Sequence, residues 1–133
     1  MNSGASPIHV FLAEDSPAIR ERVSAMLGAQ GIAVDGGAAT PQACIDGILA
    51  SRPDVVVLDG HLEGGTGLQV LDAVHAAAPE VSFVVFSNDP APAYRRRYLA
   101  HGAAGFLDKS SEFHQLAAAV QSACKRPIQQ PAR

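Results

Sequence analysis

The sequence has no tryptophan, only two cysteines among its 133 residues and no long apolar run. A membrane-spanning helix needs about 20 consecutive apolar residues, so none is expected. Cys44 and Cys124 do not form a CxxC pair, which favours free buried thiols in a reducing compartment over a disulfide. The amino-terminal residues also lack the basic and apolar segments of a secretion signal. We therefore expect a cytoplasmic protein that has no membrane partner.

Clustered positive charge is scarce as well. The formal net charge is -3 and the sequence pI is about 5.9. A nucleic-acid surface needs clustered lysine and arginine side chains to neutralise phosphates, so we expect no nucleic-acid partner. The only basic run is Arg95-Arg96-Arg97, which fits the solvated face of a helix better than a patch that docks a partner.

Short apolar runs alternate with segments of helical period, a pattern typical of βαβ units with a parallel sheet. Right-handed crossovers would lay the strands into one sheet with helices on both faces. We therefore predict an α/β, flavodoxin-like fold with five strands in the order 2-1-3-4-5 and five helices. One domain should cover residues 8–124, between flexible ends at 1–7 and 125–133. The expected strands are Ile8–Ala13, Ile32–Asp35, Val55–Leu58, Ser82–Phe86 and Gly105–Leu107.

Side chains that can accept the first free backbone N–H groups mark the expected helix starts. Proline often follows them, since its missing N–H costs nothing at the first helical position. The apolar residues beyond recur at helical spacing and are assigned to the core. The expected starts are Ser16-Pro17, Thr40-Pro41, Thr66 with Gln69 as a capping box, Asp89-Pro90, and Ser110 or Ser111.

Polar side chains follow several of the predicted strands. Glu14 and Asp15 come after the first strand, Asp59 after the third, Ser87 after the fourth and Lys109 just past the fifth. The carboxyl ends of parallel strands share one edge of the sheet, where open α/β sheets bind their ligands. We therefore expect these side chains to lie together.

These residue types have a common chemistry. Crowded carboxylates hold protons more tightly unless a cation compensates them, and Mg²⁺ prefers such oxygen ligands. A lysine and a hydroxyl opposite the metal would hold a phosphoryl group, which an aspartate can accept as an aspartyl phosphate. Taken singly, the residues fit a solvated turn, a helix cap or a surface lysine. Together they predict Mg²⁺-dependent phosphoryl transfer onto Asp59.

From about Ile8 to Cys124, the chain resembles the receiver domain of bacterial two-component response regulators. The segment Gly102–Lys109, with the sequence GAAGFLDK, is similar to that family's Gly-Ala-x-Gly-aromatic-Leu-x-Lys signature. The resemblance implies a role for each residue at the predicted edge. Glu14 and Asp15 would hold the metal, Asp59 would be phosphorylated, and Ser87 and Lys109 would be the conserved hydroxyl and lysine.

The resemblance also implies partners and a switch. The phosphate would come from a histidine kinase, a histidine phosphotransfer protein or a small donor, with Mg²⁺ held partly by the backbone carbonyl of His61. It would draw Ser87 toward it and let Phe106 turn inward, shifting a population toward a face that binds a downstream protein. The chain would be a monomer or a phosphorylation-dependent dimer. It would be no enzyme beyond its own phosphorylation and dephosphorylation.

Some positions depart from the family pattern. Gly60 replaces the usual apolar residue after the acceptor, and Glu63 replaces a proline. We expect a more flexible loop there, because glycine has more conformational freedom to lose on ordering. His61 and Asp89 occupy places that the family uses to adjust the lifetime of the phosphate, and either could orient the attacking water.

Other functions remain open. The length favours a stand-alone receiver, and the same fold could also serve as an interaction module that is never phosphorylated. A phosphatase with Asp59 as nucleophile is a further alternative, although His61 stands where haloacid-dehalogenase-like phosphatases need a second acid. In a flavodoxin-like cofactor module, Glu14 and Asp15 would repel the phosphate of the cofactor.

Overall fold

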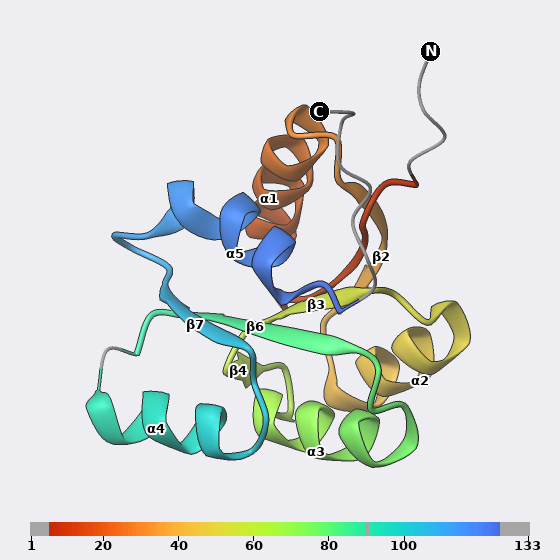
Figure 1. The fold of residues 1–133 in the computed structure, drawn as a ribbon. Helices are drawn as coiled ribbons and strands as arrows, with labels where there is room; N and C mark the ends of the chain where they lie inside the picture. Colours follow the sequence, from red (N-terminus) through yellow and green to blue (C-terminus); the bar gives the residue numbers. More distant parts are fainter. Residues whose placement is uncertain (1–5, 90, 126–133) are drawn as a thin grey trace.

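The computed structural model describes residues 6–89 and 91–125. A five-stranded parallel sheet lies between two layers of helices (Figure 1). The strand order confirms the predicted 2-1-3-4-5 when the strands of this sheet are numbered alone. Along the sheet, the strands are β2 (Ala33–Ala38), β1 (His9–Ala13), β3 (Val55–Leu58), β6 (Ser82–Ser87) and β7 (Gly105–Asp108).

The helices divide between the two faces of the sheet as the α/β fold predicts. One face carries α1 (Pro17–Ala29) and α5 (Leu116–Ala123). The other carries α2 (Pro41–Ser51), α3 (Gly67–Ala77) and α4 (Pro92–Ala100) (Figure 1). No described helix is both long enough and apolar enough to cross a bilayer.

The central strand β3 is buried on both faces. Val55 and Val57 belong to the core beneath α1 and α5, and Val56 and Leu58 belong to the core beneath α2, α3 and α4. Successive side chains of a strand point to opposite faces, so a strand covered on both sides must be apolar throughout. The valine run before Asp59 is therefore a structural requirement of its place in the sheet.

Three helix starts follow the predicted capping chemistry. The hydroxyls of Ser16 and Thr40 accept the N–H groups of Ile19 and Ala43, both at 3.2 Å. Thr66 and Gln69 form the predicted capping box at the start of α3.

The predicted strand Ile32–Asp35 is longer and begins later in the structure. Its pairing with β1 shifts between Val10 and Phe11, which places Asp35 in an irregularity, and the strand continues to Ala38. The prediction ended this strand at Asp35, before the two glycines. The structure needs a glycine at Gly37, because an added Cβ would lie 2.9 Å from the backbone oxygen of Leu12.

Two predicted helix starts are wrong. The helix expected at Asp89-Pro90 begins at Pro92, since the Asp89 carboxylate instead accepts the N–H of Ala91 (3.0 Å) in the preceding turn; Pro90 lies outside the described residues. The helix expected at Ser110 or Ser111 begins with a 3-10 turn at Phe113–Gln115 and becomes α-helical at Leu116.

The side chain of Asp108 explains the later start of the last helix. Its carboxylate oxygen Oδ1 accepts both the N–H and the hydroxyl of Ser110, at 2.8 and 2.7 Å. The hydroxyl of Ser110 is therefore engaged with a residue before it in the chain and does not cap the helix after it. Short polar side chains often compete with helix formation in this way.

The glycine-rich segment after Asp59 forms a small hairpin that the sequence did not predict. The strands β4 (His61–Leu62) and β5 (Gly65–Thr66) pair in antiparallel fashion. Gly64 has a φ of +80° at the turn, a conformation that glycine adopts without steric cost. The N–H of Glu63 also donates to the carbonyl of Ala39 at 3.0 Å, which ties the hairpin to the end of β2.

The predicted flexible ends, 1–7 and 125–133, lie largely outside the described residues, so they stay a prediction.

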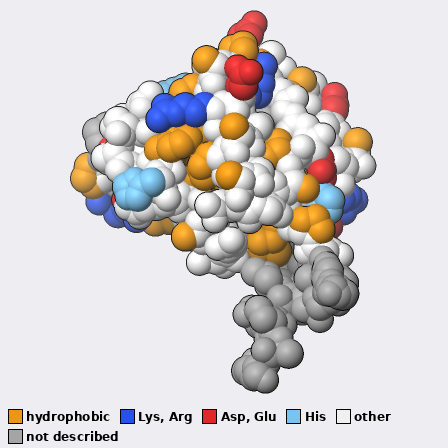
Figure 2. All heavy atoms as spheres, turned by 90° about the horizontal axis from the view of Figure 1, so that it is seen from above, with side chains coloured by type: hydrophobic (Ala, Val, Ile, Leu, Met, Phe, Trp, Pro, Cys, Tyr) orange, Lys and Arg blue, Asp and Glu red, His pale blue; other side chains and the backbone are white. Residues whose placement is uncertain are grey.

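Figure 2 views the face that carries α1 and α5. There, charged side chains of both signs are scattered among apolar ones.

The two cysteines form no disulfide, as predicted. Cys44 is fully buried and Cys124 is partly exposed. Burial raises the pKa of Cys44 to about 12, and only the thiolate is a strong nucleophile. The predicted burial therefore holds for Cys44 and only in part for Cys124.

We expect alkylation of the native protein near neutral pH to modify Cys124 and spare Cys44. Intact mass after a timed reaction with iodoacetamide measures this, and the unfolded protein, in which both residues should react, is the control. Comparable modification of Cys44 in a native Cys124→Ser variant would contradict the burial of that thiol.

Candidate functional site

Backbone pairing brings the strand ends together. Ala13 of β1 lies opposite Leu58 of β3, and the N–H of Asp59 donates to the Ala13 carbonyl at 2.8 Å. This pairing places Asp59 beside Glu14. At the same edge, where β6 and β7 end, the N–H of Lys109 donates to the carbonyl of Ser87 at 2.9 Å. The predicted convergence at the carboxyl edge is thus present in the structure.

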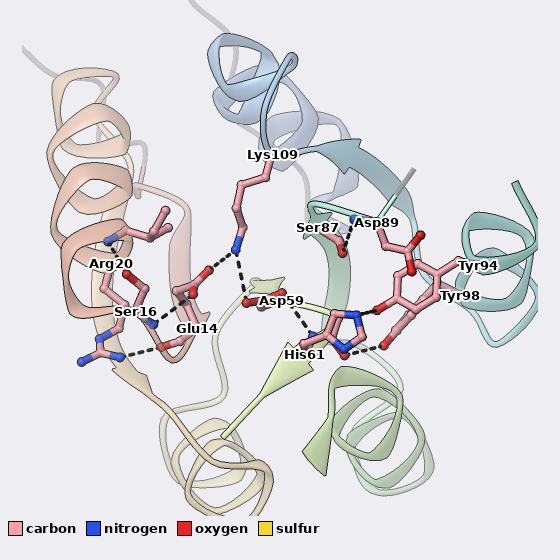
Figure 3. Close-up of polar contacts among 12 residues, drawn as sticks. Glu14, Ser16, Arg20, Asp59, His61, Ser87, Asp89, Tyr94, Tyr98 and Lys109 are labelled. Carbon is pink, nitrogen blue, oxygen red and sulfur yellow. Dashed lines mark hydrogen bonds and ion pairs between the residues drawn. The ribbon is translucent and has the colours of Figure 1, made fainter. Parts of the chain in front are cut away.

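Lys109 joins two of the carboxylates (Figure 3). Its Nζ lies 2.7 Å from Oε1 of Glu14 and 3.2 Å from Oδ2 of Asp59. The three side chains are 9%, 8% and 9% exposed, respectively. Buried charges are tolerated when they are paired and hydrogen-bonded, and this pairing meets that condition for all three groups.

At each end of the ion pair between Glu14 and Lys109, burial and pairing shift the pKa in opposite directions. Burial raises the pKa of Glu14, and the hydrogen bonds from Lys109 and from the Ser16 N–H offset this only in part. Burial favours the neutral amine of Lys109, but the carboxylates of Glu14 and Asp59 outweigh it and raise the pKa of the lysine. The ammonium group is therefore charged across the physiological range.

Three carboxylates at this edge could hold a metal ion. One ligand oxygen each from Glu14, Asp15 and Asp59 can be chosen so that all lie within 4.8 Å of one another. Glu14 and Asp59 are buried, whereas Asp15 is exposed. A set made only of carboxylate oxygens suits a hard divalent cation such as Mg²⁺ or Ca²⁺. The residues therefore fit the metal that the sequence predicts.

The remaining predicted residues surround this cluster. Ser87 is buried, and its hydroxyl accepts the N–H of Asp89 at 3.2 Å. The N–H of His61 donates to Oδ1 of Asp59 at 3.2 Å. Asp89 therefore contacts the hydroxyl and His61 contacts the acceptor, both through the backbone.

Phe106 is buried in this structure. The residue is 5% exposed, and its ring centroid lies 5.9 Å from that of Tyr94 and 6.2 Å from that of Tyr98. Phe106 therefore occupies an inward position, and its expected response to phosphorylation stays a prediction. The guanidinium of Arg95, which donates to the Phe106 carbonyl at 3.0 Å, also covers the ring.

Sequence reasoning missed some residues of the site. The guanidinium of Arg20 donates to the carbonyl of Glu14. The rings of Tyr94 and His61 stack with 5.6 Å between centroids, and an added Cβ at Gly60 would overlap the Tyr94 hydroxyl. The one available signal was the glycine itself, at a position where the family carries a side chain.

The fold and the site together define an acidic cluster closed by a lysine at the carboxyl edge of a doubly wound parallel sheet. Residues 10–121 match the family model of the response regulator receiver domain. The chain belongs to this family, which confirms the resemblance stated above.

The chain is also similar in sequence to several named proteins. The probable transcriptional regulatory protein NarL of Mycobacterium tuberculosis is 33% identical over 125 residues, covering 93% of this chain and 58% of NarL. The transcriptional regulatory protein DesR of Bacillus subtilis is 27% identical, covering 86% of this chain and 57% of DesR. A protein-glutamate methylesterase/protein-glutamine glutaminase of Anaeromyxobacter dehalogenans is 33% identical, covering 81% of this chain and 32% of that enzyme. The chain spans less than two thirds of each of these relatives.

Solved structures show the same fold. The receiver domain of the putative response regulator NarL from Mycobacterium tuberculosis superposes with a TM-score of 0.84 at 32% identity, covering 92% of this chain and 99% of that one. The Vibrio cholerae chemotaxis protein CheY4 superposes with a TM-score of 0.80 at 24% identity, covering 89% and 99%.

The buried Glu14 should make stability depend on pH in the metal-free protein. Its native pKa is raised above 4.5, so between these two pKa values the native state binds more protons than the unfolded state. The free energy of unfolding then falls as the pH rises through that window. Replacing Glu14 with glutamine removes this contribution, so the variant should gain stability relative to the wild type as the pH rises from 4.5 through the raised native pKa of Glu14.

Urea unfolding in EDTA at several pH values measures this gain. Glu21→Gln, which removes one charge from an exposed residue of α1, is the matched control. The same pH dependence in both variants would show that Glu14 is not the source.

Proposed function

We propose that this chain is a phosphoacceptor receiver of a two-component phosphorelay. Asp59 takes a phosphoryl group from the phosphohistidine of a histidine kinase or a histidine phosphotransfer protein, in a reaction that needs Mg²⁺. The observation that carries this proposal is the buried Asp59 carboxylate, held 3.2 Å from the Lys109 ammonium within a group of three carboxylates. The match to the receiver family supports it.

The groups of the site divide the chemistry of transfer. An oxygen of Asp59 attacks phosphorus, and the bond from phosphorus to the donor's imidazole nitrogen breaks with its electron pair leaving on that nitrogen. Lys109, already beside Asp59, is placed to pair with the negative phosphoryl oxygens. The cation would be held by Glu14, Asp15, Asp59 and the backbone carbonyl of His61, and when bound it would neutralise charge on the phosphoryl group.

The phosphorylated state would be read through Ser87. Its hydroxyl now accepts from the backbone of Asp89, and a phosphoryl group on Asp59 would offer it a charged acceptor instead. The turn from Ser87 to Ala91 would then follow, because Asp89 also binds Ala91. We place the response at α4, β7 and α5, where a downstream protein would bind.

The wider context follows from this role. We propose a cytoplasmic signalling module that is not an enzyme apart from its own phosphorylation and dephosphorylation. Relatives named as transcriptional regulators are longer than this chain, and we propose that the receiver itself does not contact nucleic acid. A monomer, or a dimer that forms on phosphorylation, fits this role.

Incubation with Mg²⁺ and acetyl phosphate should add one phosphoryl group, measured by intact mass. The Asp59→Asn variant, which keeps the shape of the side chain, should gain none, because an amide oxygen is a far weaker nucleophile than a carboxylate. Omitting Mg²⁺ should also prevent the gain. An equal mass gain in Asp59→Asn would move the acceptor elsewhere, and no gain in the wild type would remove the phosphoacceptor role.

His61 and Asp89 should influence how long the phosphate survives. If either orients the attacking water, its replacement by alanine should slow dephosphorylation on the order of tenfold or more. Loss of the label after the donor is removed gives the rate. His75→Ala, at an exposed histidine of α3, is the control. A rate that neither replacement changes would leave both residues without this role.

A further inference from the structure

Two tyrosines of α4 reach the residues that directly follow Asp59 (Figure 3). The hydroxyl of Tyr98 donates to the carbonyl of Gly60 at 3.3 Å, in the interior. The hydroxyl of Tyr94 lies 3.5 Å from Nε2 of His61, whose ring stacks on it with 13° between the ring planes. Both residues after the acceptor are therefore held by one helix that lies more than thirty positions away in the chain.

Glycines make room for both tyrosines. An added Cβ at Gly60 would overlap the Tyr94 hydroxyl. At Gly67 it would lie 3.1 Å from the Tyr98 hydroxyl and would also collide with the backbone oxygen of Asp59. The N–H of Gly67 donates to the carbonyl of Gly60 at 2.9 Å, so this carbonyl accepts two hydrogen bonds. The glycines thus allow close packing and do not simply loosen the loop.

The Tyr98 hydroxyl is suited to a permanent donor role. The residue is 2% exposed. Burial, with the Tyr94 hydroxyl beside it, raises the pKa of Tyr98, so the proton stays on the oxygen at every physiological pH. A buried hydroxyl that lost its acceptor would be left unsatisfied, at a cost that keeps such groups paired in native proteins.

We propose that Tyr94 and Tyr98 are positioning residues that connect α4 to residues 59–61, which we call the acceptor segment. The two contacts, Tyr98 with Gly60 and Tyr94 with His61, are together called the tie. They hold the Gly60 and His61 peptides in place for the metal and pass any displacement of these peptides to α4. This inference rests on the proposed function, since it concerns the same cation site. It adds a connection to α4 that does not pass through the Ser87 hydroxyl.

The tie has a thermodynamic consequence. If holding the acceptor segment in place favours cation binding, then cation binding must favour the position of α4 in which the tie is made, by the same factor. A tyrosine that merely fills the core would change stability on replacement but would leave cation affinity unchanged. Affinity therefore separates the two roles.

The first test needs no metal. In Tyr98→Phe, the Gly60 carbonyl loses one of its two donors while the ring stays in the core. The N–H groups of Gly67 and His61 donate to Gly60 and Asp59 of the acceptor segment. Amide hydrogen exchange at Gly67 and His61 should speed up about two- to tenfold, the range expected for one hydrogen bond. Ser51→Ala removes a hydroxyl that donates to the Gly47 carbonyl at the far end of α2 and should leave these amides unchanged.

The second test uses Mg²⁺ alone and then beryllofluoride. The chain has only two tyrosines, so ¹³C-labelled tyrosine reports on Tyr94 and Tyr98 and on nothing else. Both signals should move when Mg²⁺ and beryllofluoride bind the wild type. The dissociation constant of Mg²⁺ should rise about two- to tenfold in Tyr98→Phe, less in Tyr94→Phe because that contact is longer and exposed, and not in Ser51→Ala.

A steric pair completes the design. Gly60→Ala should displace the Tyr94 ring and lower both stability and Mg²⁺ affinity. Adding Tyr94→Ala removes the overlap, so stability should recover in part, while the affinity should stay below that of the wild type because the contact of Tyr94 with His61 is lost. This coupling between neighbouring residues is what a double-mutant cycle measures.

The outcomes separate the two proposals. If Mg²⁺ and beryllofluoride bind the wild type but the tyrosine signals stay still and Tyr98→Phe binds Mg²⁺ as Ser51→Ala does, the tie is wrong and the receiver function stands. If affinity in the double variant returns to that of the wild type, the role assigned to Tyr94 is wrong. If Mg²⁺ and beryllofluoride change nothing in the wild type relative to Asp59→Asn, the receiver function and the tie fail together.

Discussion

The contact of the Lys109 ammonium with the carboxylates of Glu14 and Asp59 is the interaction on which the site depends. Three strands contribute to it: β1 and β3 present the two acids, and the turn after β7 presents the lysine. Without the lysine, two buried carboxylates would face each other with no positive charge among them, and one would take up a proton. With it, both carboxylates have a positive charge beside them, which offsets part of the cost of burying their own charge.

Much of this could be predicted from the sequence because strand ends in a parallel sheet converge by geometry alone. The apolar run before Asp59 marks a central strand, and Glu14, Ser87 and Lys109 follow other strands at matching places. The prediction failed where the same short stretch of sequence is compatible with two different local structures. The edge strand was predicted to end at Asp35 but continues to Ala38 through two glycines, and Ser110 was predicted as a helix cap but binds Asp108.

The role of the two tyrosines lay beyond sequence reasoning for a different reason. Tyr94 and Tyr98 stand at helical spacing, which predicts only that they share a face of α4. Their contacts with His61 and Gly60 depend on how α4 sits against the hairpin, and that placement results from the packing of the whole layer of α2, α3 and α4. Long-range contacts of this kind carry no local signature.

The space above Gly60 carries a consequence for recombination between relatives. A receiver with a side chain directly after its acceptor has no room for an aromatic ring from α4 at this spot, whereas this chain has a ring and no side chain. Exchanging α4 alone between two such proteins would therefore create either a collision or a void, although each helix suits its own parent. In a chimeric receiver, α4 and the residue after the acceptor must be inherited as one unit.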